Sequence, residues 1–398
     1  MTKTLRLAGS VAALGLLLSL PAQGVSDRTL AKTFPLSPDT TLRLANLAGP
    51  VQLVPGNDGE VKVEARIFAE GSGQSETRKL LDGMSWIESR DREGRPEWAL
   101  SYPVKDYRGF AYPGTGGSHD DPGVLERLLG SWGLSGQSTS TYLGQRVSVY
   151  GAPSASVPIL YAELKITVPR RGKLVVRNVV GSVGGGQLAG NLVVDTGSGS
   201  VKIDGFEGDL YVDTGSGSVK VGASRGETKI DTGSGSITVG ELIGNGLLDT
   251  GSGSVRVEKV AAGTLRIDTG SGSVHVQNGH VGTLEADTGS GSIRVIDVEL
   301  ESFSGDTGSG GVTLQSSLAG TKDVRIDTGS GSVRIVAGPD ASFDLSADQG
   351  SGSVHVGYAD AVLKKAGHKV VGAERGSKRT RIVVETGSGS CTIEPKNG

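Results

Sequence analysis

Apolar and polar residues alternate strictly within a short segment that recurs along the C-terminal part of the chain. In one copy, TLRIDTGSGSVHV at 264–276, Leu265 and Ile267 alternate with Arg266 and Asp268. Successive side chains of a β-strand point to opposite faces. The alternation therefore predicts a strand with Leu265 and Ile267 inside and with Arg266 and Asp268 outside.

The same copy predicts a corner in its middle. Continued alternation would turn Thr269 and Ser271 inward, but Val274 and Val276 also need the inward side. One set takes odd-numbered positions and the other even-numbered ones, so a single unbroken strand cannot point both inward, and the alternation must break near Gly272. Glycine permits backbone angles and close approaches that a side chain obstructs, so GSGS is predicted to be a turn between two strands.

The copies recur at a nearly constant period. DTGSGS occurs seven times between residues 195 and 332, and DTGSGG, DQGSGS and ETGSGS are near copies. Their first residues are 18 to 21 positions apart, except for a last step of 37. These acidic residues are Asp195, Asp213, Asp231, Asp249, Asp268, Asp287, Asp306, Asp327, Asp348 and Glu385. A fixed period near 20 that lengthens slowly is typical of a stacked solenoid.

The predicted fold class is all-β, a single-stranded parallel β-helix with coils of 18–21 residues, right-handed because parallel crossovers usually are. Extra residues are predicted to accumulate in one loop, which grows from 204–209 to 315–323. Stacked Thr and Ser side chains are expected to form hydroxyl ladders at the corner. An antiparallel meander is the alternative, but it would leave the apolar side chains on one uncovered face. A second turn in each coil is marked by Gly208, Gly226, Gly244, Gly263 and Gly282.

The N-terminal part of the chain has a different composition. Twelve of the 17 aromatic residues fall between Phe34 and Tyr161. We expect an irregular strand-rich region at 25–160, followed by the repeats at 161–398. Two short helices are predicted at 75–84 and 120–130 from their capping residues and glycine stops.

Two segments interrupt this organisation. The first is an insertion at about 105–150, rich in Gly, Pro and Tyr, which is either a flexible loop or a functional one. The second is a basic segment near 359–381 with seven Lys or Arg residues. We expect it to be a solvated hairpin that extends from the terminal coil and protects the end of the stack. Binding of an acidic envelope polymer is the alternative.

The repeats and their surroundings resemble a known family. A strand-rich opening, the step VPRRG at 168–172 and coils of the form LxVxTxSGxVxV are similar to a bacterial family of β-strand repeats known as putative adhesins. The resemblance covers roughly 35–398 and is strongest over 160–395. It implies an exported β-strand-repeat fold and brings no catalytic motif. The insertion at about 105–150 departs from the family pattern.

The first residues and the cysteine content indicate the compartment. Lys3 and Arg6 precede an apolar run, and small residues follow at 22 and 24, which predicts a signal peptide at 1–24 with cleavage near Val25. The run is shorter than the ~20 residues needed to span a bilayer, so no transmembrane segment is expected after cleavage. The single cysteine, Cys391, stands where other repeats have Val and is predicted to be a buried hydrophobe.

The recurring acidic residues invite a cation-binding interpretation. Outward carboxylates one rung apart repel each other, so something must offset the repulsion. Backbone N–H groups of the corner and nearby Lys229, Arg266 and Arg325 are one explanation, and bridging divalent cations are the other. The nine-residue unit of calcium β-rolls is absent, and we predict no metal site.

The remaining residues do not indicate an active site. His275 and His355 take outward positions that carry Lys, Arg or Thr in other coils, and SHDD at 118–121 cannot form a triad within four consecutive residues. We predict no catalytic, cofactor-binding or metal residues and no cofactor. The net charge of −3 gives no general attraction to nucleic acid.

These observations predict an exported, non-enzymatic β-solenoid that serves as a cell-envelope or surface scaffold of the adhesin kind. Its location is periplasmic, surface-bound or secreted, and its partner is an envelope or surface polymer or protein. A cation-stabilised binding module and a glycan-active β-helix enzyme are the alternatives.

Overall fold

The computed structural model describes residues 26–113 and 137–396. Strands make up nearly all of its regular structure, with one helix, α1 (Gln74–Asp82). The predicted all-β fold is confirmed, and α1 lies at the helix predicted for 75–84. The signal peptide predicted at 1–24, the helix predicted at 120–130 and the SHDD segment lie outside the described residues.

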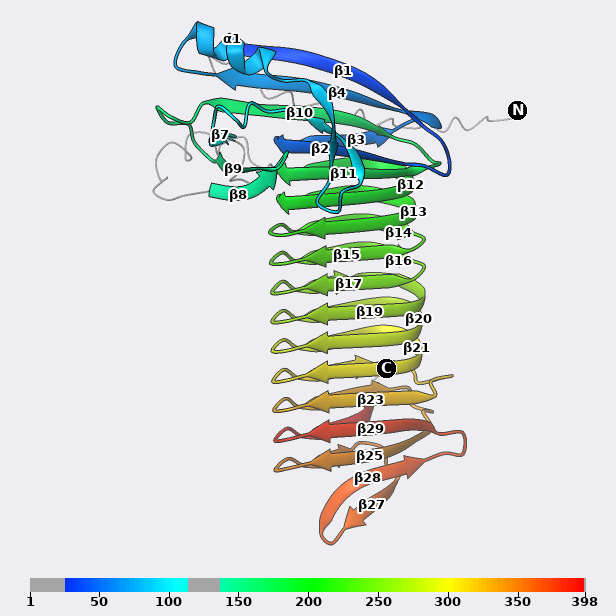
Figure 1. Ribbon diagram of the computed structural model, residues 1–398. Coiled ribbons are helices and arrows are strands. Elements are labelled where there is room, and N and C mark those ends of the chain that lie inside the picture. Colours follow the sequence, from blue (N-terminus) through cyan, green and yellow to red (C-terminus); the bar gives the residue numbers. More distant parts are fainter. Residues whose placement is uncertain (1–25, 114–136, 397–398) are drawn as a thin grey trace, which may run out of the picture.

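The N-terminal strands form one end of the stack (Figure 1). They are β1 (Ser26–Leu36), β2 (Thr41–Ala48), β3 (Val51–Pro55), β4 (Gly59–Glu70), β5 (Trp86–Arg90), β6 (Pro96–Leu100), β7 (Gly109–Ala111), β8 (Gln137–Tyr142), β9 (Gln145–Tyr150) and β10 (Ile159–Val168). β4 pairs antiparallel with both β1 and β10. β2 and β3 run parallel to strands of the first coils, with Leu44 opposite Val176 and Val51 opposite Val183.

The described parts of the predicted insertion belong to the folded body. β7, β8 and β9 come from this segment, and β7 pairs with β10 at Ala111 and Ile159. Phe110 and Tyr142 are fully buried. The flexible-loop interpretation is therefore wrong for 105–113 and 137–150, because these residues supply large side chains to the core.

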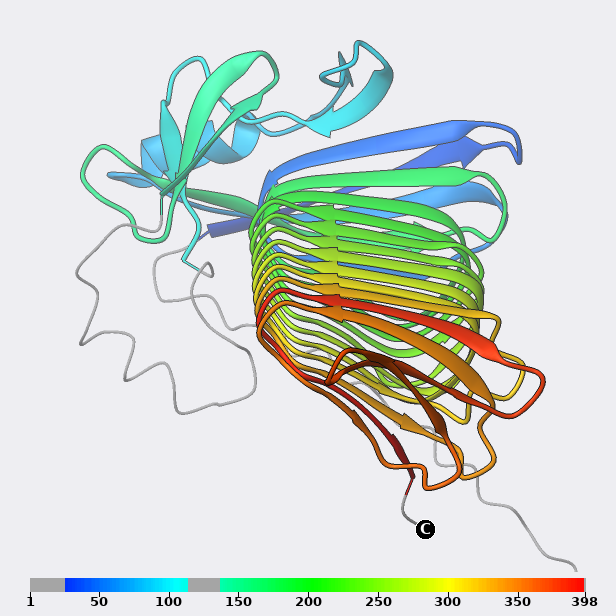
Figure 2. The ribbon, with the colours of Figure 1, turned by 90° about the horizontal axis from the view of Figure 1, so that it is seen from below.

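The repeats follow as a stack of parallel strands. They are β11 (Lys173–Val180), β12 (Val183–Ser198), β13 (Val201–Thr214), β14 (Val219–Arg225), β15 (Thr228–Thr232), β16 (Ile237–Ile243), β17 (Gly246–Thr250), β18 (Val255–Val257), β19 (Val260–Thr269), β20 (Val274–Thr288), β21 (Ile293–Thr307), β22 (Val312–Gln315), β23 (Asp323–Thr328), β24 (Val333–Ala337), β25 (Phe343–Gln349) and β26 (Val354–Val356). Each motif residue lies beside its counterpart in the next coil, as Asp231 lies beside Asp249. The view along the stack shows the coils overlaid around a common interior (Figure 2).

The coils pair in parallel, as predicted, but the sheet as a whole is mixed. Antiparallel pairs occur at both ends of the stack, between β1 and β4 and between β25 and β28 (Lys369–Arg375). At an end there is no further coil to continue the parallel ladder. A chain that reverses direction covers the exposed edge there instead.

The last coils do not stack in chain order. β27 (Val362–Ala366) and β28 form an antiparallel hairpin after the coil of β25 and β26. The chain then returns as β29 (Thr380–Thr386) and β30 (Cys391–Pro395). β29 lies between β23 and β25, with Glu385 opposite both Asp327 and Asp348 (Figure 1). The final sequence copy therefore occupies the penultimate rung, and the hairpin makes this return possible.

Extra residues enter the coils in the predicted loop. Ile243 pairs with Ala261, an offset of 18, whereas Gly246 pairs with Leu265, an offset of 19. The extra residue therefore lies between Ala261 and Leu265, after the second apolar pair of that coil. The ladder absorbs the insertion in this turn and resumes its register in the following strand.

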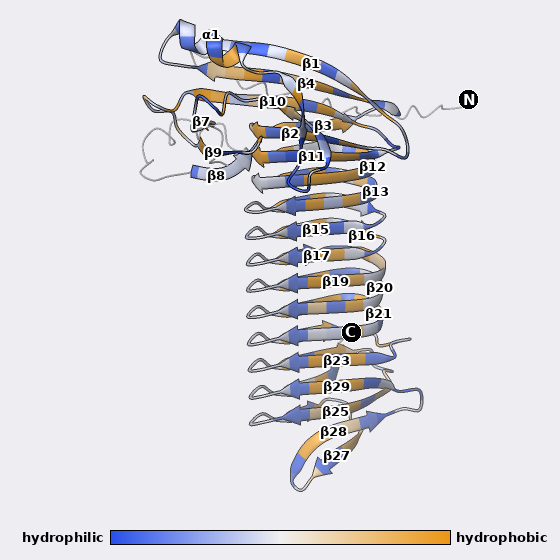
Figure 3. Cartoon of the chain, viewed as in Figure 1, coloured by the Kyte–Doolittle hydropathy of each residue, from blue (hydrophilic) through white to orange (hydrophobic). Residues whose placement is uncertain are grey.

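The core is aliphatic along the repeats and aromatic at the N-terminal end. Along each rung, apolar and polar residues alternate (Figure 3). Inward Val, Leu and Ile side chains such as Val194, Ile230 and Leu248 are fully buried. In the N-terminal region Phe34 packs against Trp86 and Trp98. One continuous cluster of buried side chains joins the two parts.

Candidate functional site

The GSGS corner brings the backbones of successive coils into contact. A Cβ atom added to Gly272 would lie 1.9 Å from the carbonyl oxygen of Gly253 in the preceding coil. No positive φ is needed at Gly272, so glycine is required there for close approach. Positive φ occurs instead at the second turn, for example +132° at Gly226.

Two details of the predicted corner are wrong. Ser271 is exposed and does not point inward, while Gly272 is buried, so the alternation breaks one residue earlier than expected. The Thr side chains do not form a hydroxyl ladder either. Thr269 Oγ1 donates to the Gly253 carbonyl at 2.7 Å and accepts from the Gly272 N–H at 3.1 Å. The threonine hydroxyl therefore joins backbone groups of two successive corners and does not bond to the threonine of the next coil.

The acidic column is the set of motif carboxylates that precede the corner. Continuous register joins Asp195, Asp213, Asp231, Asp249, Asp268, Asp287, Asp306, Asp327, Glu385 and Asp348. Rungs of a sheet are ~4.8 Å apart, so each carboxylate has like charges close by. Burial and then the charges of Asp231 and Asp268 raise the pKa of Asp249 above its ordinary value.

Backbone hydrogen bonds of the corner do not relieve this repulsion. Among the described residues, no corner N–H donates to a carboxylate of the column, because the threonine hydroxyl takes that donor. The predicted offset by backbone hydrogen bonds is therefore wrong. The basic neighbours do contribute, since Arg266 and Lys229 both act to lower the pKa of Asp249. Arg325 forms a salt bridge with Glu385 at 3.5 Å.

A second charged column follows the corner, and it was not predicted from the sequence as a candidate site. Each outward residue two positions after the corner lies beside its counterpart in the next coil. In stacking order this column is Lys202, Lys220, Thr238, Arg256, His275, Arg294, Thr313, Arg334, Thr392 and His355. It holds no acidic residue. The signal in the sequence was the Lys or Arg that follows the first Val of many repeats.

Serines that end each GSGS form a third column beside the basic one. Ser254 Oγ accepts from the backbone N–H of Ser273 at 3.1 Å, and Ser273 Oγ accepts from that of Ser292 at 3.3 Å. Ser236 Oγ accepts in the same way from Ser254 at 3.3 Å. Because each oxygen accepts from the backbone, its O–H hydrogen remains able to donate outward.

Two of the five histidines, His275 and His355, lie in this basic column. His275 Nε2 lies 3.0 Å from Gln277 Oε1, and its Nδ1 lies 3.4 Å from Arg256. Burial and then the charge of Arg256 lower the pKa of His275. His355 is exposed on the terminal coil. Within the described ranges, no cluster of three His, Cys, Asp or Glu side chains could hold a metal ion.

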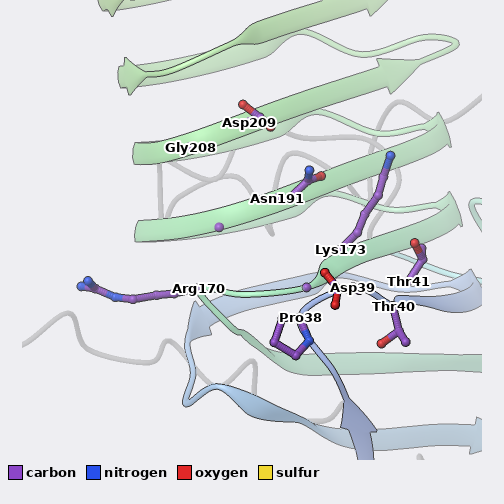
Figure 4. Close-up of a pocket in the computed structure, with 11 residues that line it drawn as sticks. Pro38, Asp39, Thr40, Thr41, Arg170, Lys173, Asn191, Gly208 and Asp209 are labelled. Carbon is purple, nitrogen blue, oxygen red and sulfur yellow. The ribbon is translucent and has the colours of Figure 1, made fainter.

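A shallow groove of about 310 Å³ lies at the second turn of the first coils (Figure 4). Asp39 and Asp209 line it together with Arg170 and Lys173. A smaller groove of about 250 Å³ shares Arg170. Because carboxylates and cations are mixed in the larger groove, it presents no field of a single sign.

The basic segment near 359–381 forms the hairpin of β27 and β28, and much of its charge is already paired. Lys364 forms salt bridges with Asp344 at 2.6 Å and with Glu374 at 2.9 Å. Arg375 pairs with Asp360 at 2.7 Å. The pair with Asp344 on β25 holds the hairpin against the terminal coil. The other pairs lie within the segment, and together they weaken the case for an acidic polymer at this place.

Cys391 is fully buried in the penultimate rung, opposite Val333. Burial raises the pKa of its thiol to about 12. The predicted hydrophobic role is confirmed, because a thiol that stays protonated and inaccessible is unreactive.

A family model matches part of the chain. Residues 242–394 match the model of the Toastrack family, DUF4097. The family resemblance predicted from the sequence is confirmed. A search of curated proteins found no match.

Solved structures similar to this chain have low sequence identity. A putative cell adhesion protein from Clostridium sporogenes is 11% identical, with a TM-score of 0.16, and the match covers 93% of this chain and 100% of that one. A putative adhesin from Bacteroides fragilis is 12% identical, with a TM-score of 0.27 and coverage of 93% and 97%. A putative lipid binding protein from Parabacteroides distasonis is 10% identical, with a TM-score of 0.33 and coverage of 91% and 96%.

Proposed function

We propose that this protein is an exported, non-enzymatic scaffold of the cell envelope or surface, with an adhesive role. The observation that carries the proposal is the division of labour within each repeat, between residues that join the coils and residues that face outward. Its glycines and threonines are occupied in holding one coil to the next, as Gly272 and Thr269 are. The outward positions on both sides of the corner present charges in straight lines. The stack therefore presents an extended charged surface along its length, as a scaffold or adhesin would require.

The proposal includes the finer predictions from the sequence. The coils of 18–21 residues wind in a right-handed sense, as parallel crossovers usually do. The N-terminal 24 residues direct export and are removed near Val25. Within the described residues, no helix is long and apolar enough to cross a membrane.

Export is tested with the native N-terminus in place. The full chain with a C-terminal tag is expressed in a bacterium, the cells are fractionated, and the recovered protein is sequenced from its N-terminus. We expect mature protein beginning near Val25 in the envelope or the medium. Recovery of uncleaved chain in the cytoplasm would overturn the localisation.

The adhesive role is tested by attachment. A strain that lacks the protein is expected to attach less well to a surface than the same strain complemented with the full chain. A matched complementation with a chain that lacks residues 1–24 keeps the protein inside the cell and controls for expression. Equal attachment by all three strains would contradict the role.

A further inference from the structure

The basic column and the serine column together form a continuous outward surface, here called the basic face. Lys202 and Lys220 occupy adjacent rungs, and Arg256, His275 and Arg294 occupy three more. The four Lys and Arg side chains among these are exposed. Adjacent rungs are ~4.8 Å apart, so the cations recur at one or a few multiples of that distance.

Most of these cations are available to a partner. Across the described residues, Lys202, Lys220 and Arg294 form no salt bridge, whereas Arg334 is paired with Glu394 at 2.8 Å. Two more carboxylates, Asp204 and Glu258, lie two positions along the strands from the basic column, and no acidic residue lies in either column of the face. Charged groups of one sign in a line attract an extended partner of the other sign.

The serines add hydrogen-bond donors along the same line. The oxygens of Ser236, Ser254 and Ser273 accept backbone N–H groups, which fixes them at the rim of each corner. Their O–H groups are left to donate toward solvent. The basic face therefore offers a hydroxyl donor in most rungs and a cation in many of them.

We infer that the basic face binds an extended anionic polysaccharide of the uronic-acid type, laid along the stack. Such a chain carries one carboxylate on each sugar ring and many hydroxyl oxygens, and an extended ring is comparable in length to one rung. Lys and Arg side chains pair with the carboxylates, and the serine hydroxyls donate to ring and hydroxyl oxygens. This inference deepens the proposed function, since an exported scaffold meets such polymers.

The composition of the face favours a polysaccharide over other polyanions. Proteins that hold single-stranded nucleic acid stack its bases on large aromatic side chains, and neither column of the basic face contains Phe, Tyr or Trp. Proteins that lie on membranes bury large apolar side chains beside their basic residues. The residues of these two columns are serine, threonine, histidine, lysine and arginine, apart from Gly311.

The test is a binding titration with purified mature protein and oligogalacturonate, with neutral dextran as the comparison polymer. We expect binding to oligogalacturonate that weakens as salt is raised, and no binding to dextran. The triple variant Lys220→Gln, Arg256→Gln, Arg294→Gln removes three cations from the basic face. It should lose about tenfold in affinity, because each exposed ion pair contributes a modest part of that factor.

The basic residues beside the acidic column offer a matched control. The variant Lys229→Gln, Arg266→Gln, Arg325→Gln removes the same number of cations from the opposite side of the corner, and its affinity should stay within about twofold of the wild type. Circular dichroism of both variants is the check that each is folded. Equal losses in the two variants, or no binding by the wild type, would overturn the inference. Equal or tighter binding of single-stranded DNA or of phosphatidylglycerol vesicles would also overturn it. None of these results bears on signal cleavage, so export is judged separately.

Discussion

The repeats and the N-terminal region belong to one stack but are held together by different means. In the repeats, backbone lies directly on backbone at each corner, and the side chains between are aliphatic. In the N-terminal region large side chains join separate segments, as Tyr142 does when its hydroxyl donates to the carbonyls of Leu100 at 2.6 Å and Ala45 at 3.1 Å. The corners of the regular stack leave no room for a side chain, whereas the irregular end is held together by large buried side chains.

The buried threonine that follows each motif carboxylate occupies a position that changes where the repeats meet the N-terminal region. Thr196 lies opposite Asn178, and Asn178 lies opposite Asn46. Asn178 Nδ2 donates to the carbonyls of Gly49 at 2.9 Å and Gly181 at 3.0 Å. The asparagine thus bonds to the carbonyls of two successive corners, and the same position keeps a buried polar side chain that stabilises the turn.

The largest effect is expected at the irregular end. Tyr142→Ala should lower the free energy of unfolding by about 4 kcal/mol, since it removes a fully buried ring and its two hydrogen bonds. Tyr142→Phe, which keeps the ring, should cost only about 1.5 kcal/mol. Chemical denaturation measures both, and equal costs would mean that the ring adds nothing to the packing.

In the repeats the corner should be the most sensitive place. Gly272→Val should cost about 3 kcal/mol, because its Cβ would meet the Gly253 carbonyl, which cannot move without its own coil. Arg266→Ala, on an exposed position of the same coil, should cost less than about 0.5 kcal/mol. Thermal unfolding of both proteins is the measurement, and equal midpoints would refute the role of the corner.

The threonine hydrogen bonds should contribute less than the glycine contact. Thr250→Val keeps the shape but loses the bond to the Gly235 carbonyl at 2.7 Å and the bond from the Gly253 N–H at 3.1 Å. We expect a loss of about 2 kcal/mol, since buried partners are left unpaired. Thr238→Val, on the outward side, is the control and should be nearly neutral. A neutral Thr250→Val would show that the backbone alone defines the corner.

The acidic column should be slightly destabilising at neutral pH. Burial and neighbouring carboxylates raise the pKa of Asp249. A folded-state pKa above the unfolded one favours folding at acid pH, and this contribution is lost as pH rises through the folded pKa. Asp249→Asn should therefore raise stability at pH 7 by a few tenths of a kcal/mol after solvent screening, and the gain should vanish at about pH 3.

The matched comparison is Asp204→Asn, which lies outside the column. Denaturation curves for the two variants at both pH values provide the measurement. A loss of stability in Asp249→Asn at pH 7 would mean that the ionised column is favourable.

The smallest effect concerns divalent cations. Calcium at a hundredfold excess over Kd would add about 2.7 kcal/mol if it bridged the column in the folded state alone. We expect calcium and chelator, compared at matched ionic strength because screening also relieves repulsion, to give nearly the same unfolding midpoint. A calcium-specific rise that disappears when Asp231, Asp249 and Asp268 are changed together to Asn would instead favour the cation-binding module.

Most of the repeating part of this protein follows from local patterns in its sequence. Alternation around Leu265 and Ile267 identified the inward residues, and the loop that takes up extra residues was located from spacing alone. These two predictions succeed because they depend on local rules, namely the two-residue period of a strand and the need for identical corners to stack. The acidic column was visible for the same reason.

Contacts between distant segments could be learned from the three-dimensional structure alone. The return of β29 between β23 and β25 rests on pairing of Glu385 with Asp327 and Asp348, which no local pattern encodes. The burial of Tyr142 and the separate reasons for glycine at 272 and at 226 likewise follow from what lies in neighbouring coils. The basic face emerged in the same way, since lysines and arginines scattered over many repeats become one line only when the register of the stack places them side by side.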